Sequence, residues 1–307
     1  MSLRSITDFL VYAVVRVLIC VLQALSLRAC GQLARNLTVL FSDVLRIRHR
    51  VIDENLACAF PQLTADERRV LARQMWEHLL LMIMEIAQAP RKIHETNWRD
   101  HITLTGSEAL VRALLDDRPT VIVSAHYGNF ELSGFLLGLL GFSSLTIARP
   151  LDNPYLDRFL HRFRATKRQY IVPKTGSAKQ LDALLARGGT LTLLGDQHAG
   201  PKGCWVDFFG RPASTHKGIA LFALVNDAAI ALCYCRRVGA PLRHILGAEA
   251  TADIRSLDPS LHNVTALTQW YTQLLEQIIR RSPEQYWWVH RRWKDTRTAR
   301  PSRERAA

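Results

Sequence analysis

Cysteine is scarce in this chain and follows no chemical pattern. The six cysteines among 307 residues form no C-x-x-C pair and show no zinc-type spacing with histidines. The cysteines therefore predict no zinc site and no disulfide framework, and a reducing compartment is the simplest interpretation. Cys233 and Cys235 alternate within an apolar run, which is typical of one buried face of a strand.

Acidic residues are also in deficit, with 27 Asp and Glu against 40 Lys and Arg, so the net charge is +13. Such a surplus suits nucleic acid, an anionic membrane surface or an acidic partner protein. No RNP, helix-turn-helix or zinc signature occurs, so no nucleic-acid partner is expected. A basic membrane-binding or nucleic-acid-binding module without chemistry stays open as a non-enzyme alternative. The G-x-S-x-G elbow of serine hydrolases is missing, which argues against that class.

The N-terminal apolar segment lacks a small-residue cleavage site, so it is not expected to be a removed signal peptide. It runs from Phe9 to Leu27 with interruptions at Arg16 and Gln23. A tilted span and a helix lying in the membrane interface both fit, and a buried amphipathic helix of a soluble protein is the alternative. Arginines gather after the segment rather than before it, which predicts a catalytic domain on the cytoplasmic side.

The most informative stretch is 119–137, in which a β-branched run at 120–123 precedes His126 and then a helical pattern. This order places His126 where a buried strand gives way to a helix, a common site for chemistry in an α/β sheet. Glu131 follows five residues later, about 140° around a shared helix, so the two side chains meet only if His126 lies outside it. The pair would then act as a general base and its orienting carboxylate. The alternative is a strand-end histidine and a solvated glutamate.

A second apolar run, 190–194, ends in Gly195, Asp196 and Gln197. If its strand is parallel to the first, both polar side chains reach the same sheet edge as His126. We expect Asp196 to help position a substrate hydroxyl or a basic residue; otherwise it is a strand-end turn residue. An arginine-rich helix is predicted at 155–168, which is either a solvated face or a source of an anion-binding guanidinium.

Four blocks of sequence carry a resemblance that covers nearly the whole chain. The chain resembles the lipid A late acyltransferase family, whose H-x-G-N-[WF]-E motif matches His126-Tyr-Gly-Asn-Phe-Glu131. The other blocks are similar to that family's N-L-x-x-A-F-P, V-x-F-F-G and P-E-Q-Y-x-W-x-H-R-R-[FW]-K segments. They are Asn55-Leu-Ala-Cys-Ala-Phe60-Pro61, Val206-Asp-Phe-Phe-Gly-Arg-Pro-Ala-Ser-Thr215 and Pro283-Glu-Gln-Tyr-Trp-Trp-Val-His-Arg-Arg-Trp-Lys294.

The resemblance implies an α/β fold with a mixed, mainly parallel sheet flanked by helices, of the glycerol-3-phosphate acyltransferase type. It implies an N-terminal anchor at 1–30, a catalytic domain at 31–296 and a basic, disordered tail at 297–307. Residues 203–217 would shape the acceptor site. The aliphatic stretch 79–86 would form ordinary core, or else line an acyl tunnel.

The implied activity is acyl transfer at the bacterial inner membrane from acyl carrier protein to a hydroxyl of a lipid acceptor, without metal or redox cofactor. Acyl-CoA as donor, and a glycosylated phospholipid or amino-acid lipid as acceptor, stay open. His126 would be the base and Glu131 its partner. The implied substrate-binding residues are Arg164, Arg149, Asn129, Asp196 and Gln197. Arg164 or backbone amides near Gly128 would stabilise the oxyanion.

Overall fold

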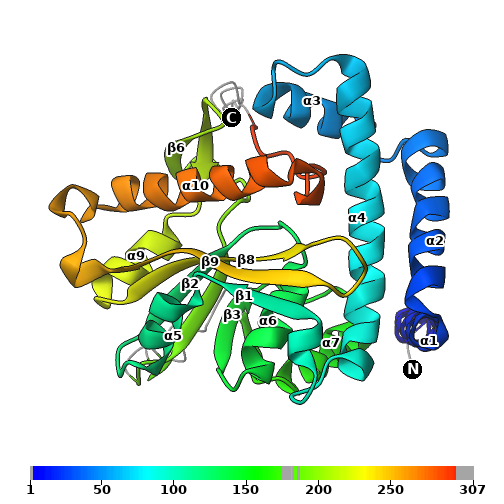
Figure 1. Ribbon diagram of the computed structural model, residues 1–307, viewed down its shortest axis with the longest axis horizontal. Coiled ribbons are helices and arrows are strands. Elements are labelled where there is room, and N and C mark those ends of the chain that lie inside the picture. Colours follow the sequence, from blue (N-terminus) through cyan, green and yellow to red (C-terminus); the bar gives the residue numbers. More distant parts are fainter. Residues whose placement is uncertain (1–2, 174–180, 182, 185–186, 295–307) are drawn as a thin grey trace, which may run out of the picture.

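The computed structural model describes residues 3–173, 181, 183–184 and 187–294, which form an α/β fold around one large sheet (Figure 1). The sheet order is β1-β9-β8-β2-β5-β3-β4, and all its pairs are parallel except β8 with β9. This confirms the expected fold class. The strands are β1 Ile102–Thr105, β2 Thr120–Ser124, β3 Ser144–Ala148, β4 Gln169–Pro173, β5 Thr190–Leu194, β8 Ala229–Arg237 and β9 His244–Asp253.

Strand β2 is central because both of its faces are apolar. Val121 and Val123 pack into the core beneath α9 (Gly218–Val225) and α10 (Val264–Arg281). Ile122 points the other way, among side chains of α5 (Ser107–Leu115) and α6 (Phe130–Leu139). Alternate residues of a strand face opposite sides of a sheet, so this continuous apolar run requires helices on both faces.

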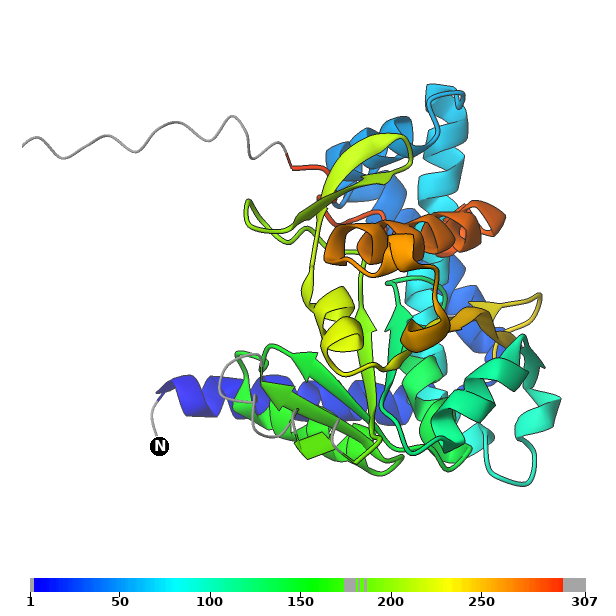
Figure 2. The same cartoon turned by 90° about the vertical axis from the view of Figure 1, so that its left-hand side faces the viewer.

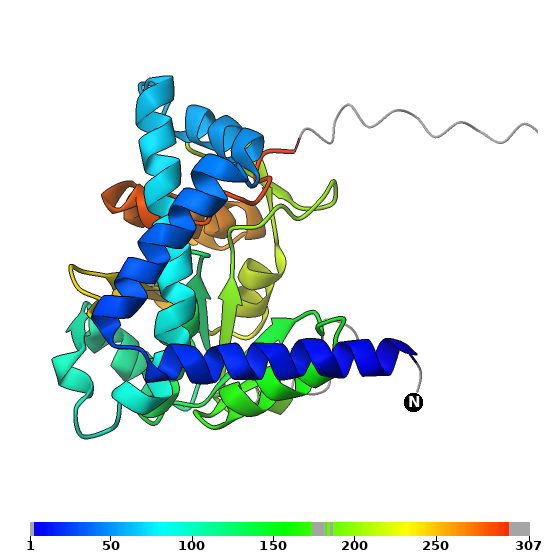
Figure 3. The ribbon, with the colours of Figure 1, turned by 90° about the vertical axis from the view of Figure 1, so that its right-hand side faces the viewer.

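The N-terminal part is helical and packs at one side of the sheet (Figures 1 and 3). Its elements are α1 Leu3–Ala24, α2 Leu27–Thr38, a π-helical turn η1 Val39–Val44, α3 His49–Ala59 and α4 Ala65–Lys92. Thr64 and Glu67 form a capping box at the start of α4. The stretch 79–86 belongs to α4, and its buried Leu and Met side chains pack into two core clusters, which confirms a core role.

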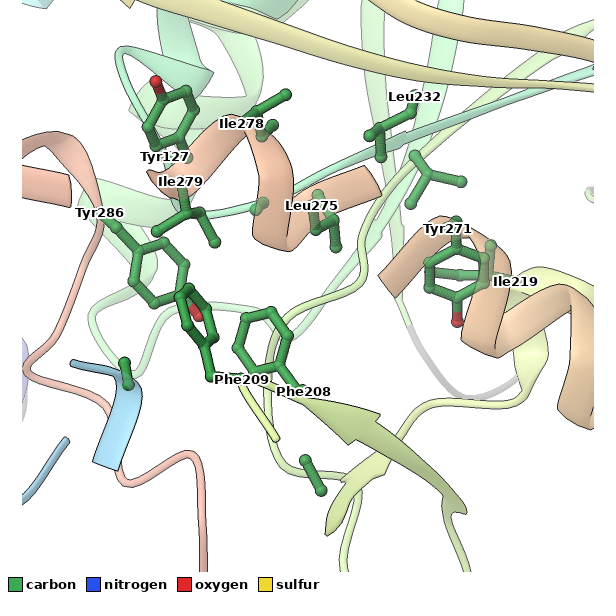
Figure 4. Close-up of a cluster of buried hydrophobic side chains, with 14 of the residues drawn as sticks. Tyr127, Phe208, Phe209, Ile219, Leu232, Tyr271, Leu275, Ile278, Ile279 and Tyr286 are labelled. Carbon is green, nitrogen blue, oxygen red and sulfur yellow. The ribbon is translucent and has the colours of Figure 1, made fainter. Parts of the chain in front are cut away.

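An aromatic core joins α10 to a separate hairpin of β6 (Cys204–Phe208) and β7 (Arg211–Thr215). Figure 4 shows Phe208 and Phe209 next to Tyr286, below Leu275 and Ile279 of α10. The rings of Phe208 and Phe209 meet edge to face, with centroids 4.8 Å apart. Residues 203–217 contain this hairpin, which lies beside the end of the sheet where β2 and β5 finish (Figure 2).

The remaining helical elements are short, apart from α7 (Pro154–Ala165), which follows β3. Helix α7 ends three residues before the predicted boundary, and Arg168 after it has a positive φ of 56°. Asn153 caps its first turn by accepting from the amides of Tyr155 and Leu156. The 3-10 turns are η2 Trp98–Asp100, η3 Ile254–Ser256, η4 Pro259–Leu261 and η5 Pro283–Gln285.

Candidate active site

His126 lies in the loop between β2 and α6, outside the helix, as the order of strand, histidine and helix in the sequence predicted. The loop is fastened to two other segments. The amide of Gly128 donates to the carbonyl of Gln285, and the amide of Asn129 donates to the carbonyl of Cys235. Gly128 has φ +60°, and a Cβ there would lie 2.1 Å from the Cys235 carbonyl oxygen. Only glycine therefore allows the loop to approach β8 this closely.

The carboxylate that holds the imidazole belongs to Asp196. Strands β2 and β5 are parallel, with Ser124 opposite Leu194, so the two strands end side by side. The Nδ1 atom of His126 is 2.9 Å from Oδ1 of Asp196, and the backbone amide of His126 donates to Oδ2 at 3.0 Å. A carboxylate only accepts, so Nδ1 carries the proton and Nε2 carries the lone pair.

His126 and Asp196 each shift the pKa of the other. Burial disfavours the imidazolium of His126, but the attraction and hydrogen bond of Asp196, with a smaller attraction from Glu131, raise its pKa above the ordinary value. Burial likewise opposes ionisation of Asp196, yet the attraction and hydrogen bonds of His126 lower its pKa. Tyr286 also donates its hydroxyl to Asp196. Asp196 is therefore ionised, and its hydrogen bonds orient the ring of His126.

Around Nε2 the site is partly aromatic. The side-chain amide of Gln197 lies 3.3 Å from Nε2 of His126 and can donate to its lone pair. Trp287 and Phe130 flank the ring, with centroids 4.8 and 5.0 Å from that of His126. The carbonyl of His126 accepts from the amide of Trp287. These contacts restrict the imidazole to one orientation.

Glu131, expected to orient His126, has a different partner. Its carboxylate binds the guanidinium of Arg164, whose Nε lies 3.1 Å from Oε2 and whose Nη2 binds Oε1. Both side chains are largely buried, with 21% and 12% of their surfaces exposed. Glu131 starts α6 and Arg164 ends α7, so this ion pair ties the two helices together beside His126. The role of Glu131 in catalysis stays a prediction.

A cavity of about 700 Å³ opens at these groups. His126, Glu131, Arg164 and Gln197 line its polar part. The rest is largely apolar and reaches between α5, α6 and the sheet; its wall includes Leu104, Leu110, Leu114, Ile122, Leu137, Leu140, Phe142, Cys233 and Leu246. A pocket of this size with a few convergent polar groups is typical of a binding site for a largely apolar ligand.

The remaining predicted site residues are placed as follows. Arg149 lines the cavity rim, is 83% exposed and pairs with Asp152 at 3.1 Å. Asn129 is fully buried: its carbonyl caps α6 at Leu132, and its amide donates to Glu85 at 3.1 Å. Asn129 therefore builds the loop and does not face the cavity. The amides of Gly128 and Asn129 are also engaged, so they are not the oxyanion donors that the sequence suggested.

A buried polar network holds the loop between His126 and α6 in place. Glu85 of α4 binds Arg237 of β8 through two hydrogen bonds of 2.7 Å. Arg237 also donates to Nδ1 of His78 at 2.8 Å, and Nε2 of His78 donates to the carbonyl of Gly128 at 3.2 Å. Burial and the positive charge of Arg237 lower the pKa of His78 to about 3, so this histidine is neutral. The network fixes the turn between His126 and α6.

Sequence reasoning missed the contribution of the C-terminal block. Tyr286 and Trp287 contact the two members of the His126–Asp196 pair, and Asn55 ties α3 to the same block by donating to the carbonyls of Trp288 and His290. Arg292 is buried and donates to the carbonyl of Ser214 in β7. The high density of aromatic and basic residues at 286–294 is the sequence signal for this block, but it does not indicate which residues the block contacts.

Fold and site together define an enzyme that transfers an acyl group: a histidine held by a carboxylate lies at the polar end of a largely apolar cavity. Within the part of the chain that the structure describes, no three His, Cys, Asp or Glu side chains are grouped to hold a metal ion.

Comparison with known proteins gives the family. Residues 1–295 match the family model described as bacterial lipid A biosynthesis acyltransferase, and the chain belongs to this family. It is 25% identical over 256 residues to a lipid A biosynthesis palmitoleoyltransferase of Escherichia coli, covering 81% of this chain and 80% of that protein. It is 24% identical over 265 residues to the lauroyltransferase of the same organism, covering 84% and 83%. A Haemophilus influenzae lipid A biosynthesis acyltransferase is 25% identical, covering 80% and 78%.

Proposed function

We propose that this acyltransferase moves a fatty acyl chain from the thioester of acyl carrier protein to a hydroxyl of a lipid A precursor at the cytoplasmic face of the bacterial inner membrane. The observation that carries the proposal is the His126–Asp196 pair, 2.9 Å apart, at the polar end of the apolar cavity. The relatives' names support the acceptor, since both Escherichia coli proteins are named as lipid A biosynthesis acyltransferases of particular acyl groups.

In the proposed reaction, Nε2 of His126 takes the proton of the acceptor hydroxyl as its oxygen attacks the thioester carbonyl carbon. Asp196 stabilises the imidazolium that results. The negative charge that forms on the carbonyl oxygen requires a positive donor, and Arg164 lies on the same cavity wall. Collapse breaks the carbon–sulfur bond, and the imidazolium returns its proton to the leaving thiolate. The products are an ester and a free thiol.

Charge supports the donor and the location. Acyl carrier proteins are acidic, and the net charge of +13 favours both such a partner and an anionic membrane surface. Among the described residues, Arg4–Ala24 is the one helix long and apolar enough to cross a membrane, with a mean hydropathy of 2.1. Acyl-CoA as donor, or another lipid as acceptor, would use the same base and cavity.

The proposal is tested with purified protein, acyl carrier protein and CoA thioesters in parallel, and a lipid A precursor in vesicles, with the product identified by mass spectrometry. His126→Ala should lower transfer by about 10²–10⁴-fold while the variant stays folded, with a cooperative thermal transition. The matched control is His262→Ala, because His262 is exposed in the 3-10 turn region before α10. Full transfer by His126→Ala, or none by the wild-type protein on this acceptor, would refute the proposal.

A further inference from the structure

Helix α1 has two chemically different sides. Ile6, Leu10, Val14, Val17 and Val21 recur at intervals of three or four residues and are 44–62% exposed, so they form one continuous apolar face. Ser5, Tyr12, Arg16 and Gln23 lie on the opposite side, within a sector of about 40° at 100° per residue. No residue in the apolar stretch of α1 is buried, so no other part of the described chain packs over this apolar face.

The polar side is attached to the catalytic domain at both of its ends. Near the N-terminus, Ser5 hydrogen-bonds the hydroxyl of Tyr155 at 3.2 Å, and Asn153 donates to the carbonyl of Asp8 at 2.8 Å. Near the C-terminus, Gln23 donates to the carbonyl of Ala87 in α4 at 2.9 Å. Helix α1 is therefore held to the domain by α7 near its N-terminus and by α4 near its C-terminus, and Figure 3 shows it running beside α7.

Aromatic contacts fill the region between these two ends. Tyr12 stacks on Tyr155, with ring centroids 6.1 Å apart, and the guanidinium of Arg16 lies 4.9 Å from the ring centre of Phe159. Arg16, which would be costly in the middle of a membrane span, is thus held against α7 and also donates to the hydroxyl of Tyr12 at 3.1 Å.

These attachments limit the orientations that α1 can take in a bilayer while it stays bound to the domain. Ser5 and Gln23 are about 27 Å apart along a helix with a 1.5 Å rise, close to the roughly 30 Å thickness of a hydrocarbon core. If α1 spanned the bilayer in this arrangement, α7 would enter the hydrocarbon with Asp157, Arg158 and Arg162. Each such charge costs about 2.5–3.5 kcal/mol at the bilayer centre.

We propose that α1 does not span the membrane but lies in the plane of its interface, with the face Ile6 to Val21 in the lipid and α7 on the aqueous side. The occupant of the exposed face is an anionic phospholipid surface, which the exposed Arg158 and Arg162 of α7 complement in charge. The same α7 carries Arg164 to the cavity, so one helix connects the lipid surface to the active site. This inference rests on the membrane location in the proposed function.

Nitroxide labels on single cysteines measure the depth of α1 in vesicles of phosphatidylethanolamine and phosphatidylglycerol. A C20S/C58S background leaves only the buried cysteines 30, 204, 233 and 235. Labels at Ile6→Cys, Val14→Cys and Val21→Cys should all lie about 5–10 Å below the phosphates, within a few Å of one another. The control is Asp66→Cys at the far end of α4, which is 84% exposed and should stay in water.

Three results would overturn the inference. A label at Val14 deeper than the other two by about 10–12 Å would show a span, because eight residues of helix rise about 12 Å. Spin coupling between labels, with shielding from both oxygen and nickel, would show that a second copy of the chain covers the face. Aqueous labels would show that no membrane is bound. The transfer assay of His126→Ala is separate, so failure of this inference is distinguishable from failure of the proposed function.

A cross-link tests the attachment in the membrane-bound state. In the same background, Ser5→Cys with Tyr155→Cys should join efficiently through a bismaleimide on vesicles, because the two native side chains meet at 3.2 Å. The matched control is Leu10→Cys with Tyr155→Cys, since Leu10 faces away from α7 and is 57% exposed. Cross-linking of the first pair in solution but not on vesicles would show that α1 leaves α7 to span, and would overturn the inference.

Discussion

Asp196, at the end of β5, binds both the ring Nδ1 and the backbone amide of His126, at 2.9 and 3.0 Å. One carboxylate therefore fixes the tautomer of the imidazole and the position of its backbone. Parallel pairing of β2 and β5 brings the two residues together across 70 positions of sequence. The central claim of the proposed mechanism is that Asp196, more than Glu131, makes His126 a base.

Arg164 and Glu131 should behave as a unit in kinetics. We expect Arg164→Ala to lower kcat by about 10²–10³-fold, the usual cost of removing one oxyanion donor. The Glu131→Gln change should cost less, and the double variant should lose less than the product of the two losses, with a coupling of about 0.5–3 kcal/mol.

The control for that cycle is Arg162→Ala, an exposed arginine two residues away on the same helix, which should weaken vesicle binding but leave kcat nearly unchanged. Equal losses for Arg162→Ala and Arg164→Ala would mean that general charge, rather than the position of Arg164, matters. Strict additivity would show that the ion pair has no role in the reaction.

Gly128 should be far less tolerant of a side chain than another glycine of similar conformation. At Gly128 the backbone has φ +60°, and the Cβ of an alanine would lie 2.1 Å from the carbonyl oxygen of Cys235, so the loop that carries His126 must move. We expect kcat to fall by at least about 10²-fold, because displacement of a catalytic base by about 1 Å is that costly. Gly239→Ala, in the turn between β8 and β9, carries a similar φ of +66° with nothing within 4 Å of the new Cβ.

The comparison separates backbone strain from the clash. Backbone strain should lower the free energy of unfolding of each variant by at most about 1–3 kcal/mol, which denaturant titration measures. Only Gly128→Ala should lose activity. An active Gly128→Ala enzyme would show that the close approach of this loop to β8 is not needed.

The sequence was sufficient to place His126 and the elements around it, and it was insufficient for the partners. The apolar runs at 120–123 and 190–194 predicted two buried strands, and the order strand, histidine, helix put His126 outside α6. The choice between Glu131 and Asp196 depends on which strands are neighbours and on the direction of each side chain at the sheet edge. Those are properties of packing across long separations, which local periodicity does not contain.

The C-terminal block illustrates the same limit. Residues 283–294 are rich in aromatic and basic side chains, yet Tyr286 and Trp288 are buried, and Trp287 packs against His126. Composition alone does not distinguish an exposed aromatic surface from an aromatic wall inside the protein, because both need large rings with polar edges.

The length of the transferred chain should depend on the apolar part of the cavity. Leu110 of α5 lines it, so Leu110→Trp should shift the preferred donor toward chains shorter by about two to four carbons, since each buried CH₂ contributes about 0.8 kcal/mol. Competition between donors of different length, with products resolved by mass spectrometry, measures the shift. Leu115→Trp, on the same helix but 72% exposed and outside the cavity wall, should change nothing. Unchanged chain preference in Leu110→Trp would place the acyl chain elsewhere.

The pH dependence of kcat/KM in Asp196→Asn and Glu131→Gln tests the central claim most directly. The base works only when neutral, so wild-type activity should fall as the pH drops through a His126 pKa above 6.5. Asparagine has one acceptor oxygen, so it can keep only one of the two hydrogen bonds that Asp196 accepts from His126, and it removes the charge, which lowers that pKa. In Asp196→Asn the acidic limb should therefore move to lower pH and the maximum should fall by about 10²–10⁴-fold. Glu131→Gln should move the limb much less. A limb that stays in place in Asp196→Asn but moves in Glu131→Gln would contradict the account.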